Sequence, residues 1–143
     1  MRLSLFTDYA FRLLIHVAAR DPELVTIAQV SEAYDIPRNH LTKIAHELGR
    51  AGYLENVRGR GGGMRLARPA GEINLGRLVR LGEGGSPLVE CFDRATNQCV
   101  ITPACGLKHM LAEACNAFYA VLDQRTLADI VKRPRELLDL LEK

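Results

Sequence analysis

Apolar side chains recur with helical spacing along most of the chain, and this spacing predicts the first element. Between residues 4 and 20 a 3.6-residue repeat predicts a helix that buries one face, formed by Leu5, Phe6, Ala10, Leu13, Leu14 and Val17. Ser4 or Thr7 can cap this helix, and the charge of Asp8 suits its first turn. Asp8, Arg12 and His16 interrupt the apolar stretch at helical spacing, and Asp21-Pro22 ends the helix.

The next two segments predict a helix-turn-helix. Thr26 opens the sequence TIAQ, a capping box with Gln29 that starts a short helix reaching about Tyr34. After a break at residues 35–36, Pro37 suits the start of a helix that runs to about Ala51. The inward positions of that helix are Leu41, Ile44, Ala45 and Leu48. Two short helices joined by a tight turn are typical of DNA-binding proteins.

Two short strands, residues 53–57 and 64–66, follow these helices and predict a hairpin wing. Its connection holds four glycines and two arginines: Arg58, Gly59, Arg60, Gly61, Gly62 and Gly63. A cationic tip without bulky side chains suits the negative potential of a minor groove. A glycine-rich phosphate cradle for a nucleotide is the alternative. The segment lacks the Gly-Lys-Ser/Thr ending of a P-loop, and it lies between strands rather than before a helix.

The remaining chain predicts a long helix that needs a partner. A short helix over 73–81 is broken by Gly82, Gly84, Gly85 and Pro87. From about Cys105 a single apolar stripe runs over four turns: Leu107, Met110, Leu111, Ala114, Phe118, Val121 and Leu122. In a chain of 143 residues such a stripe calls for another surface, and a symmetric dimer is the commonest solution. Two short helices are expected between Thr126 and Leu141, so the fold class is mainly α, a winged helix-turn-helix with a long C-terminal dimerisation helix.

Charge is distributed unevenly in a way that favours a polyanionic partner. The net charge is only +2, but residues 38–80 carry nine basic and three acidic side chains, whereas the flanking segments are each net −2. This local excess indicates a nucleic-acid footprint, with a solvated basic face as the alternative. The third predicted helix exposes Arg38, Asn39, His40, Lys43, His46 and Arg50 on its outer side. Arg and Asn have the donor sets that read base edges in the major groove, and Lys43 suits a phosphate.

Three of the four cysteines lie in one segment without helical or strand periodicity. Cys91, Cys99 and Cys105 are spaced Cys-x7-Cys-x5-Cys within residues 90–105. Three thiolates there predict an iron–sulfur cluster or a metal with one position left open. The wide spacing favours a cluster over zinc, and redox-active thiols without metal are a further alternative. The fourth ligand is open among Cys115, His109, Glu90, Asp93 and a group from another subunit, although Cys115 lies on the apolar stripe and is most simply a core residue.

Other function classes find less support in the sequence. No nucleophile–base pair or paired carboxylates occur at meaningful spacing, so we expect no enzyme. The first twenty residues resemble an amphipathic helix of the mature protein rather than a signal peptide, which predicts a cytoplasmic protein. A small electron carrier would need the cysteines but not the basic helix and wing. A zinc-stabilised structural module is the remaining alternative.

The chain resembles a known family of winged-helix, iron–sulfur transcription regulators over nearly its whole length. The family includes the nitric-oxide-sensitive NsrR group and the cluster-biogenesis IscR group. The similarity rests on LFTDYAFRLLIHVA, on IPRNHLTKIAHELGRAGYLENVRGRGGGMRLAR and on CVITPACGLK, and the later TLADIV looks like the NsrR group in particular.

The resemblance implies a specific ligand set and function. By it, Cys91, Cys99 and Cys105 ligate a 4Fe–4S cluster, and Asp8 of the other subunit is the fourth ligand. IscR-like proteins instead have a histidine three residues after the last cysteine and bind 2Fe–2S; here that position is Lys108, and His109 follows it. The implied function is a homodimeric repressor of a double-stranded, palindromic operator that releases DNA when its cluster reacts with nitric oxide. The alternative is an IscR-like regulator that senses cluster supply or redox state through 2Fe–2S.

We therefore expect three functional parts. Residues 1–82 form the winged helix-turn-helix domain, residues 83–105 the cluster-binding loop, and residues 106–143 the dimerisation helix and the C-terminal helices. Within the first part, the expected DNA contacts are Arg38, Asn39, His40 and Lys43 of the recognition helix and Arg58, Arg60, Gly61, Gly62 and Gly63 of the wing.

Overall fold

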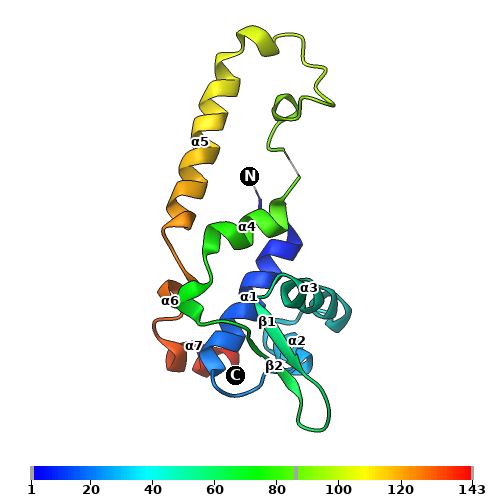
Figure 1. Cartoon of the computed structure of the whole chain (residues 1–143), viewed down its shortest axis with the longest axis vertical. Coiled ribbons are helices and arrows are strands. Elements are labelled where there is room, and N and C mark those ends of the chain that lie inside the picture. The colour runs from blue at the N-terminus through cyan, green and yellow to red at the C-terminus, as the bar shows by residue number, and fades with distance from the viewer. Residues whose placement is uncertain (1, 86, 143) are drawn as a thin grey trace.

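The computed structural model describes residues 2–85 and 87–142, which fold into helices and one hairpin joined by irregular segments (Figure 1). The helices are α1 (Leu5–Arg20), α2 (Ile27–Tyr34), α3 (Arg38–Arg50), α4 (Leu75–Glu83), α5 (Gly106–Asp123), α6 (Leu127–Ile130) and α7 (Pro134–Leu141). Strands β1 (Leu54–Val57) and β2 (Gly63–Leu66) form the hairpin. Three short 3-10 turns cover Ala70–Glu72, Glu90–Phe92 and Thr102–Ala104. The sequence prediction of a mainly α winged helix-turn-helix is confirmed.

Side-chain caps start the first two helices where the sequence predicts them. The hydroxyl of Ser4 accepts a hydrogen bond from the backbone N–H of Thr7 at 3.2 Å, which caps α1. Thr26 and Gln29 form the reciprocal capping box at the start of α2. Each cap satisfies N–H groups that have no partner within their own helix.

The turn between α2 and α3 is tight because Asp35 adopts the left-handed conformation. Its φ is +52°, a region that Asp tolerates better than most residues. The backbone N–H of Asp35 bonds to the carbonyl of Ser31, and the Ser31 hydroxyl donates to the carbonyl of Ile36 at 2.7 Å. Ile36 is buried, so the turn is also held to the core by its apolar side chain.

The wing is an antiparallel hairpin with a fixed register. Leu54 pairs with Leu66 and Val57 with Gly63, and Glu55 forms a 2.9 Å ion pair with Arg65 across the strands. The hydrogen bond and charge of Arg65 hold the pKa of Glu55 below its usual value. Met64 also pairs with Val25 on the opposite side of β2, so this strand is joined to the segment before α2.

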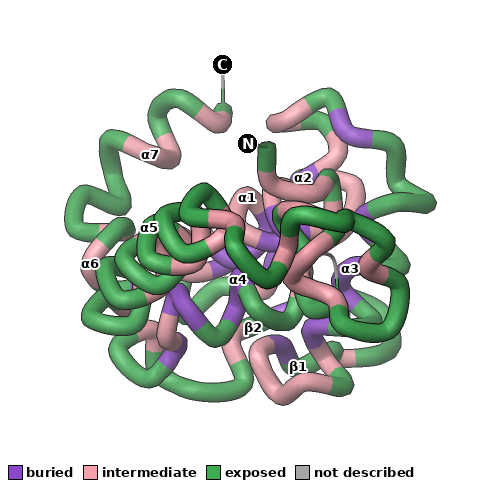
Figure 2. Tube along the Cα trace, turned by 90° about the horizontal axis from the view of Figure 1, so that it is seen from above, coloured by how far each residue is buried: buried purple, intermediate pink, exposed green. Residues whose placement is uncertain are grey.

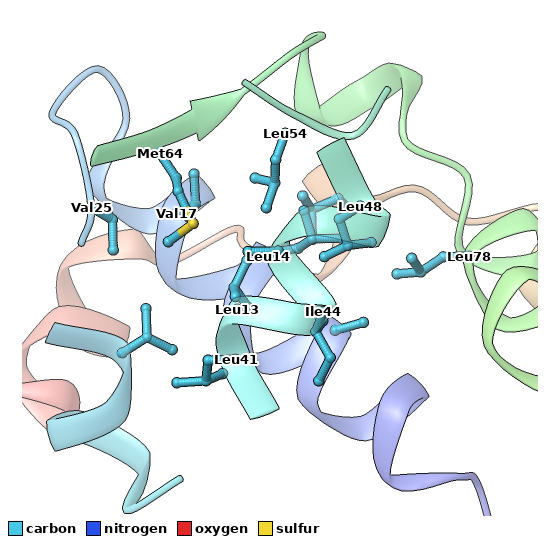
Figure 3. Packing of buried hydrophobic residues seen from close by; sticks show 14 of the residues in the cluster. Leu13, Leu14, Val17, Val25, Leu41, Ile44, Leu48, Leu54, Met64 and Leu78 are labelled. Atoms are coloured by element: carbon cyan, nitrogen blue, oxygen red, sulfur yellow. The ribbon is translucent and has the colours of Figure 1, made fainter. Parts of the chain in front are cut away.

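One apolar cluster holds the helix-turn-helix, the wing and α1 together (Figure 3). Leu13, Leu14 and Val17 of α1 lie among Leu41, Ile44 and Leu48 of α3, with Leu54 and Met64 of the hairpin above them. Leu78 of α4 and Leu127 of α6 belong to the same cluster. The outer face of α3 therefore has a rigid support.

The C-terminal end of α5 is fastened to the start and middle of α4. The N–H of Leu75 bonds to the carbonyl of Arg125 at 3.0 Å, and the N–H of Leu127 bonds to the carbonyl of Ile73 at 2.8 Å. Arg80 forms a bidentate pair with Asp123, at 2.5 and 2.8 Å, and its guanidinium lies 4.4 Å from the centroid of the Tyr119 ring. The α5 helix thus projects from the winged helix-turn-helix part at a braced junction.

Along its whole length α5 lacks a buried residue (Figure 2). Leu107, Met110 and Val121 are 62%, 69% and 63% exposed, so most of the predicted apolar stripe faces outward in the single chain. Among the described residues no helix is long and apolar enough to cross a bilayer.

Three details of the predicted helices were wrong. Leu5 is 52% exposed rather than on the buried face, because it lies in the first turn of α1, past the main cluster. His16 is 2% exposed rather than part of a polar face, because Tyr34 of α2 lies against it and α7 packs on α1. The predicted helix over 73–81 is shifted to Leu75–Glu83, since the side chain of Asn74 caps it by accepting from the N–H of Arg77.

Candidate DNA interface and cysteine segment

The outer face of α3 presents the predicted base-reading side chains to solvent. Arg38, Asn39, His40 and Lys43 are all exposed, while the opposite face of the helix is buried through Leu41, Ile44 and Leu48. In the described part of the chain, no ion pair engages Arg38 or Lys43. Both cations are therefore available to a polyanion.

The N-terminus of α3 is also open to an anion. Pro37 occupies the N-cap position and provides no side-chain hydrogen bond to the first turn. Free N–H groups and the helix dipole at such a terminus attract phosphate oxygens. The helix α3 thus combines exposed side chains that are predicted to read bases with an N-terminus that is open to a phosphate.

The wing tip has a conformation that requires glycine. Gly59 and Gly61 have φ values of +100° and +76°, and the N–H of Gly62 donates to the carbonyl of Gly59 at 3.0 Å. A Cβ on Gly62 would lie 2.3 Å from the carbonyl oxygen of Val57, which no ordinary contact permits. Arg58 lies just before this turn and Arg60 within it, and both are exposed. The predicted cationic, narrow tip is present.

Asp8 lies in the first turns of α1 and has a local partner. Its carboxylate is 2.9 Å from the guanidinium of Arg12, one helical turn later, and both side chains are 42% exposed. The same guanidinium lies 5.9 Å from the Tyr9 ring and 5.8 Å from the Tyr34 ring. The Asp8 carboxylate is accessible, but in the single chain it is paired with Arg12.

The cysteine segment connects α4 to α5 and carries its three thiols on irregular backbone (Figure 1). Cys91 lies in the 3-10 turn Glu90–Phe92, Cys99 is exposed, and Cys105 is the N-cap residue of α5. None of the three forms a disulfide. Next to Cys99, Val100 and Ile101 are 91% and 61% exposed.

Polar side chains of the segment itself shape the long gap between Cys91 and Cys99. Asp93 accepts hydrogen bonds from the N–H of Ala95 at 2.9 Å and from the hydroxyl of Thr96 at 2.8 Å. These bonds keep the pKa of Asp93 below its usual value. Asn97 accepts from the N–H of Cys99 at 3.1 Å and donates to the hydroxyl of Thr102. Sequence reasoning missed these turns, although Asp and Asn followed by polar residues are a known signal for them.

These turns bear on two of the candidates for a fourth ligand. The carboxylate of Asp93 is engaged in its own turn, and that of Glu90 accepts from the N–H of Gln98. Cys91, Cys115, His109 and Lys108 line one cavity of about 380 Å³ between the segment and α5. Cys115 therefore lies near Cys91, on the side of α5 that faces the segment.

Within the described residues of one chain, no three His, Cys, Asp or Glu side chains are gathered closely enough to hold a metal ion. The donor set nonetheless suits an iron–sulfur cluster in kind, because three free and partly accessible thiols on one irregular segment are the ligands such clusters take. The ligand set Cys91, Cys99, Cys105 and Asp8 remains a prediction.

Comparisons with known proteins show which family the chain is similar to. The model of the Rrf2 family, described as an iron-dependent transcriptional regulator, matches residues 3–133. The chain is 50% identical to the HTH-type transcriptional regulator NsrR of Bacillus subtilis strain 168, covering 99% of this chain and 98% of that protein. It is 45% identical to the regulator of the same name from Geobacillus kaustophilus, covering 100% and 98%.

Solved structures of similar proteins share the fold. The oxidised form of Staphylococcus aureus CymR aligns with a TM-score of 0.72 at 27% identity, covering 92% of this chain and 96% of that one. T. potens IscR aligns with a TM-score of 0.73 at 24% identity, covering 96% and 90%.

Proposed function

Since the chain belongs to the Rrf2 family of transcriptional regulators, we propose that it is a homodimeric, DNA-binding repressor that senses nitric oxide through a 4Fe–4S cluster. The observation that carries this proposal is structural: three free thiols lie on one segment between the DNA-binding part and the exposed helix α5. Full-length similarity to proteins named NsrR supports it. Family membership also agrees with the expectation that the chain is no enzyme.

DNA binding rests on α3 and the wing. Arg38 and Asn39 have the geometry to pair with guanine and adenine edges, whereas His40, Lys43 and the open N-terminus of α3 suit the phosphates beside them. Arg58 and Arg60 reach the adjacent minor groove from a tip narrowed by Gly61, Gly62 and Gly63. Both elements are held by the same core, so a rigid module docks as one unit.

Dimerisation is supported by the exposed apolar side chains of α5. Exposed apolar patches mark interaction sites, and α5, 18 residues long, has no buried residue. A second copy that packs its own α5 against this surface would cover Leu107, Met110 and Val121. A two-fold dimer then binds a palindromic operator with one α3 in each half-site.

Cluster binding is assigned to Cys91, Cys99 and Cys105, with Asp8 of the second subunit as fourth ligand. When bound, the cluster supplies iron that reacts with nitric oxide. Around it, the hydrogen bonds of Asp93 and Asn97 hold the segment between Cys91 and Cys99 in compact turns. Arg12 is positioned to hold the Asp8 carboxylate whenever that carboxylate has no other partner. Because Asp8 belongs to α1 and α1 packs against α3, the ligand lies one helix from the DNA-reading face.

The test is DNA binding before and after nitric oxide. A fluorescent duplex selected from a random pool by the anaerobically purified protein is followed by anisotropy during addition of a nitric-oxide donor. The proposal expects tight binding that is lost on addition, and weak binding throughout for Cys99→Ser. Tight binding that survives nitric oxide, or that Cys99→Ser retains, would show that the thiol segment does not control the repressor.

A further inference from the structure

The first turn of α1 is fastened to the last turn of α4 by the carboxylate of Glu83. This carboxylate accepts a hydrogen bond from the backbone N–H of Ser4 at 2.9 Å and a second, short one from the hydroxyl of Thr7. The Ser4 hydroxyl lies 3.4 Å from the carbonyl of Gly82 and completes the contact. Thr7 is fully buried, so its hydroxyl has no access to solvent as a substitute partner.

The close approach of the two helices depends on Gly82. A Cβ at this position would lie 2.0 Å from the Thr7 hydroxyl oxygen and 3.0 Å from Cδ1 of Phe6. Any side chain there would push α1 and α4 apart. Gly82 therefore leaves the space that the Thr7 hydroxyl needs to reach the carboxylate of Glu83, the next residue of α4.

Glu83 is badly placed for its own helix and well placed for α1. A carboxylate at the C-terminal end of α4 opposes that helix's dipole, whereas at the N-terminal end of α1 it complements the dipole and the orphan N–H groups. Partial burial pushes the pKa of Glu83 upward, but hydrogen bonds from Thr7 and Ser4 outweigh it and hold that pKa below its usual value. A local role in α4 therefore does not explain Glu83.

The residues beside this contact are those of the proposed sensor. Thr7 directly precedes Asp8, and one residue turns an α-helix by about 100°, so fixing Thr7 sets the direction of the Asp8 carboxylate. Glu83 is the last residue of α4, and the chain leaves it through Gly84 and Gly85, the latter with φ of +104°, toward the cysteine segment. The contact thus lies where α4 ends and the chain turns toward that segment.

We propose that Glu83 is a positioning residue for the cluster: by holding Thr7 it aims Asp8 at the partner subunit's cysteine segment. This inference rests on the proposed function and deepens it, because it names a residue outside the ligand set on which ligation depends. Glu83 touches no ligand itself and acts through α1.

The experiment compares cluster lifetimes in anaerobically reconstituted, full-length protein. The loss of the visible absorption and circular dichroism of the cluster is timed in excess EDTA for wild type, Glu83→Ala, Asp8→Ala and the double variant. Since the lost hydrogen bonds have a charged acceptor, we expect Glu83→Ala to lose its cluster roughly tenfold faster, with an altered dichroism spectrum. Glu83→Ala should add nothing to Asp8→Ala in the double variant, because Glu83 acts through Asp8.

Two matched controls separate positioning from general stability. Thr7→Ser keeps the hydroxyl and should behave as wild type, whereas Thr7→Val keeps the shape without the hydroxyl and should shorten the cluster lifetime. Asp129→Ala removes another helix-capping carboxylate, in α6, far along the chain from this contact. Even where its melting temperature falls as far as that of Glu83→Ala, Asp129→Ala should leave the cluster lifetime and the dichroism spectrum unchanged.

The outcomes are distinguishable. If Asp8→Ala leaves the cluster unaltered, the proposed ligand is wrong and Glu83 has nothing to position. If Asp8→Ala shortens the cluster lifetime but Glu83→Ala has the wild-type lifetime, the proposal of Asp8 as a ligand survives and the inference about Glu83 fails. The inference also fails if Glu83→Ala shortens the lifetime by the same factor in the Asp8→Ala background, because Glu83 then acts by another route.

Discussion

Replacing Gly62 by alanine should open the wing and weaken DNA binding without unfolding the core. The new Cβ would lie 2.3 Å from the Val57 carbonyl oxygen, about 1 Å inside ordinary contact, which begins at 3.4 Å. The same Cβ would lie 2.9 Å from the carbonyl oxygen of Gly59, so it cannot shift to that side either. The turn must therefore widen by about 1 Å, and it carries Arg58 and Arg60 with it.

The expected effect is on binding more than on stability. The tip is exposed and lies outside the apolar cluster, so the domain should keep its melting temperature within a few degrees. Displacing two arginines should weaken operator binding on the order of tenfold. It should also reduce the salt slope, the slope of log K against log salt concentration, by about 1–2, because each lost phosphate contact lowers that slope by about 0.9. Anisotropy titrations at several salt concentrations measure both quantities.

Two other glycines give matched controls. Gly61→Ala adds backbone strain of about 1–2 kcal/mol without a clash, because φ is +76° but no atom lies within 4 Å. Gly71→Ala meets no atom and has no positive φ, so it should bind DNA as wild type. If Gly62→Ala matches Gly71→Ala in affinity and salt slope, the wing does not contact DNA in the way argued.

Three further predictions concern other parts of the chain. Arg38→Ala should cost roughly 1–3 kcal/mol of binding and relax specificity at one base pair, whereas Lys43→Ala should weaken all sequences equally; binding to a panel of single-base operator variants checks this. Burial and, secondly, Arg20 hold the pKa of His16 below 6.5, so the unfolded state binds the proton more tightly. Folding stability should then fall as the pH drops from about 7 toward 5, and His16→Phe should lessen that loss in urea titrations followed from pH 7 to 5. Cys115→Ser should retain iron and sulfide by chemical analysis, since the proposed ligands are Cys91, Cys99, Cys105 and Asp8; loss of the cluster would instead make Cys115, which shares a cavity with Cys91, a ligand.

Local signals in the sequence predicted much of the DNA-binding part. The capping box at Thr26, Pro37 before α3 and the glycines of the wing act over a few residues, and each was found where the sequence placed it. The exposure of Arg38 and Lys43 followed from helical spacing alone, because Leu41 and Ile44 fix the opposite face.

Features that depend on contacts between distant segments could not be predicted. The bond between Thr7 and Glu83 spans 76 residues, and no local pattern marks either partner. The burial of His16 depends on α7 and α2 covering α1, and its two ring nitrogens have no hydrogen-bond partner among the described residues. In the cysteine segment, the spacing identified the thiols but not the turns at Asp93 and Asn97, because these form through side-chain bonds rather than apolar periodicity.

The most direct test of the account is the iron, sulfide and zinc content of anaerobically purified protein, with its visible spectrum followed during nitric-oxide addition. The account predicts about four irons and four sulfides per chain and a spectrum that bleaches as nitric oxide is added. About two irons per chain would favour the 2Fe–2S alternative. Zinc without iron or sulfide would contradict the central claim and leave a winged-helix regulator with a different signal.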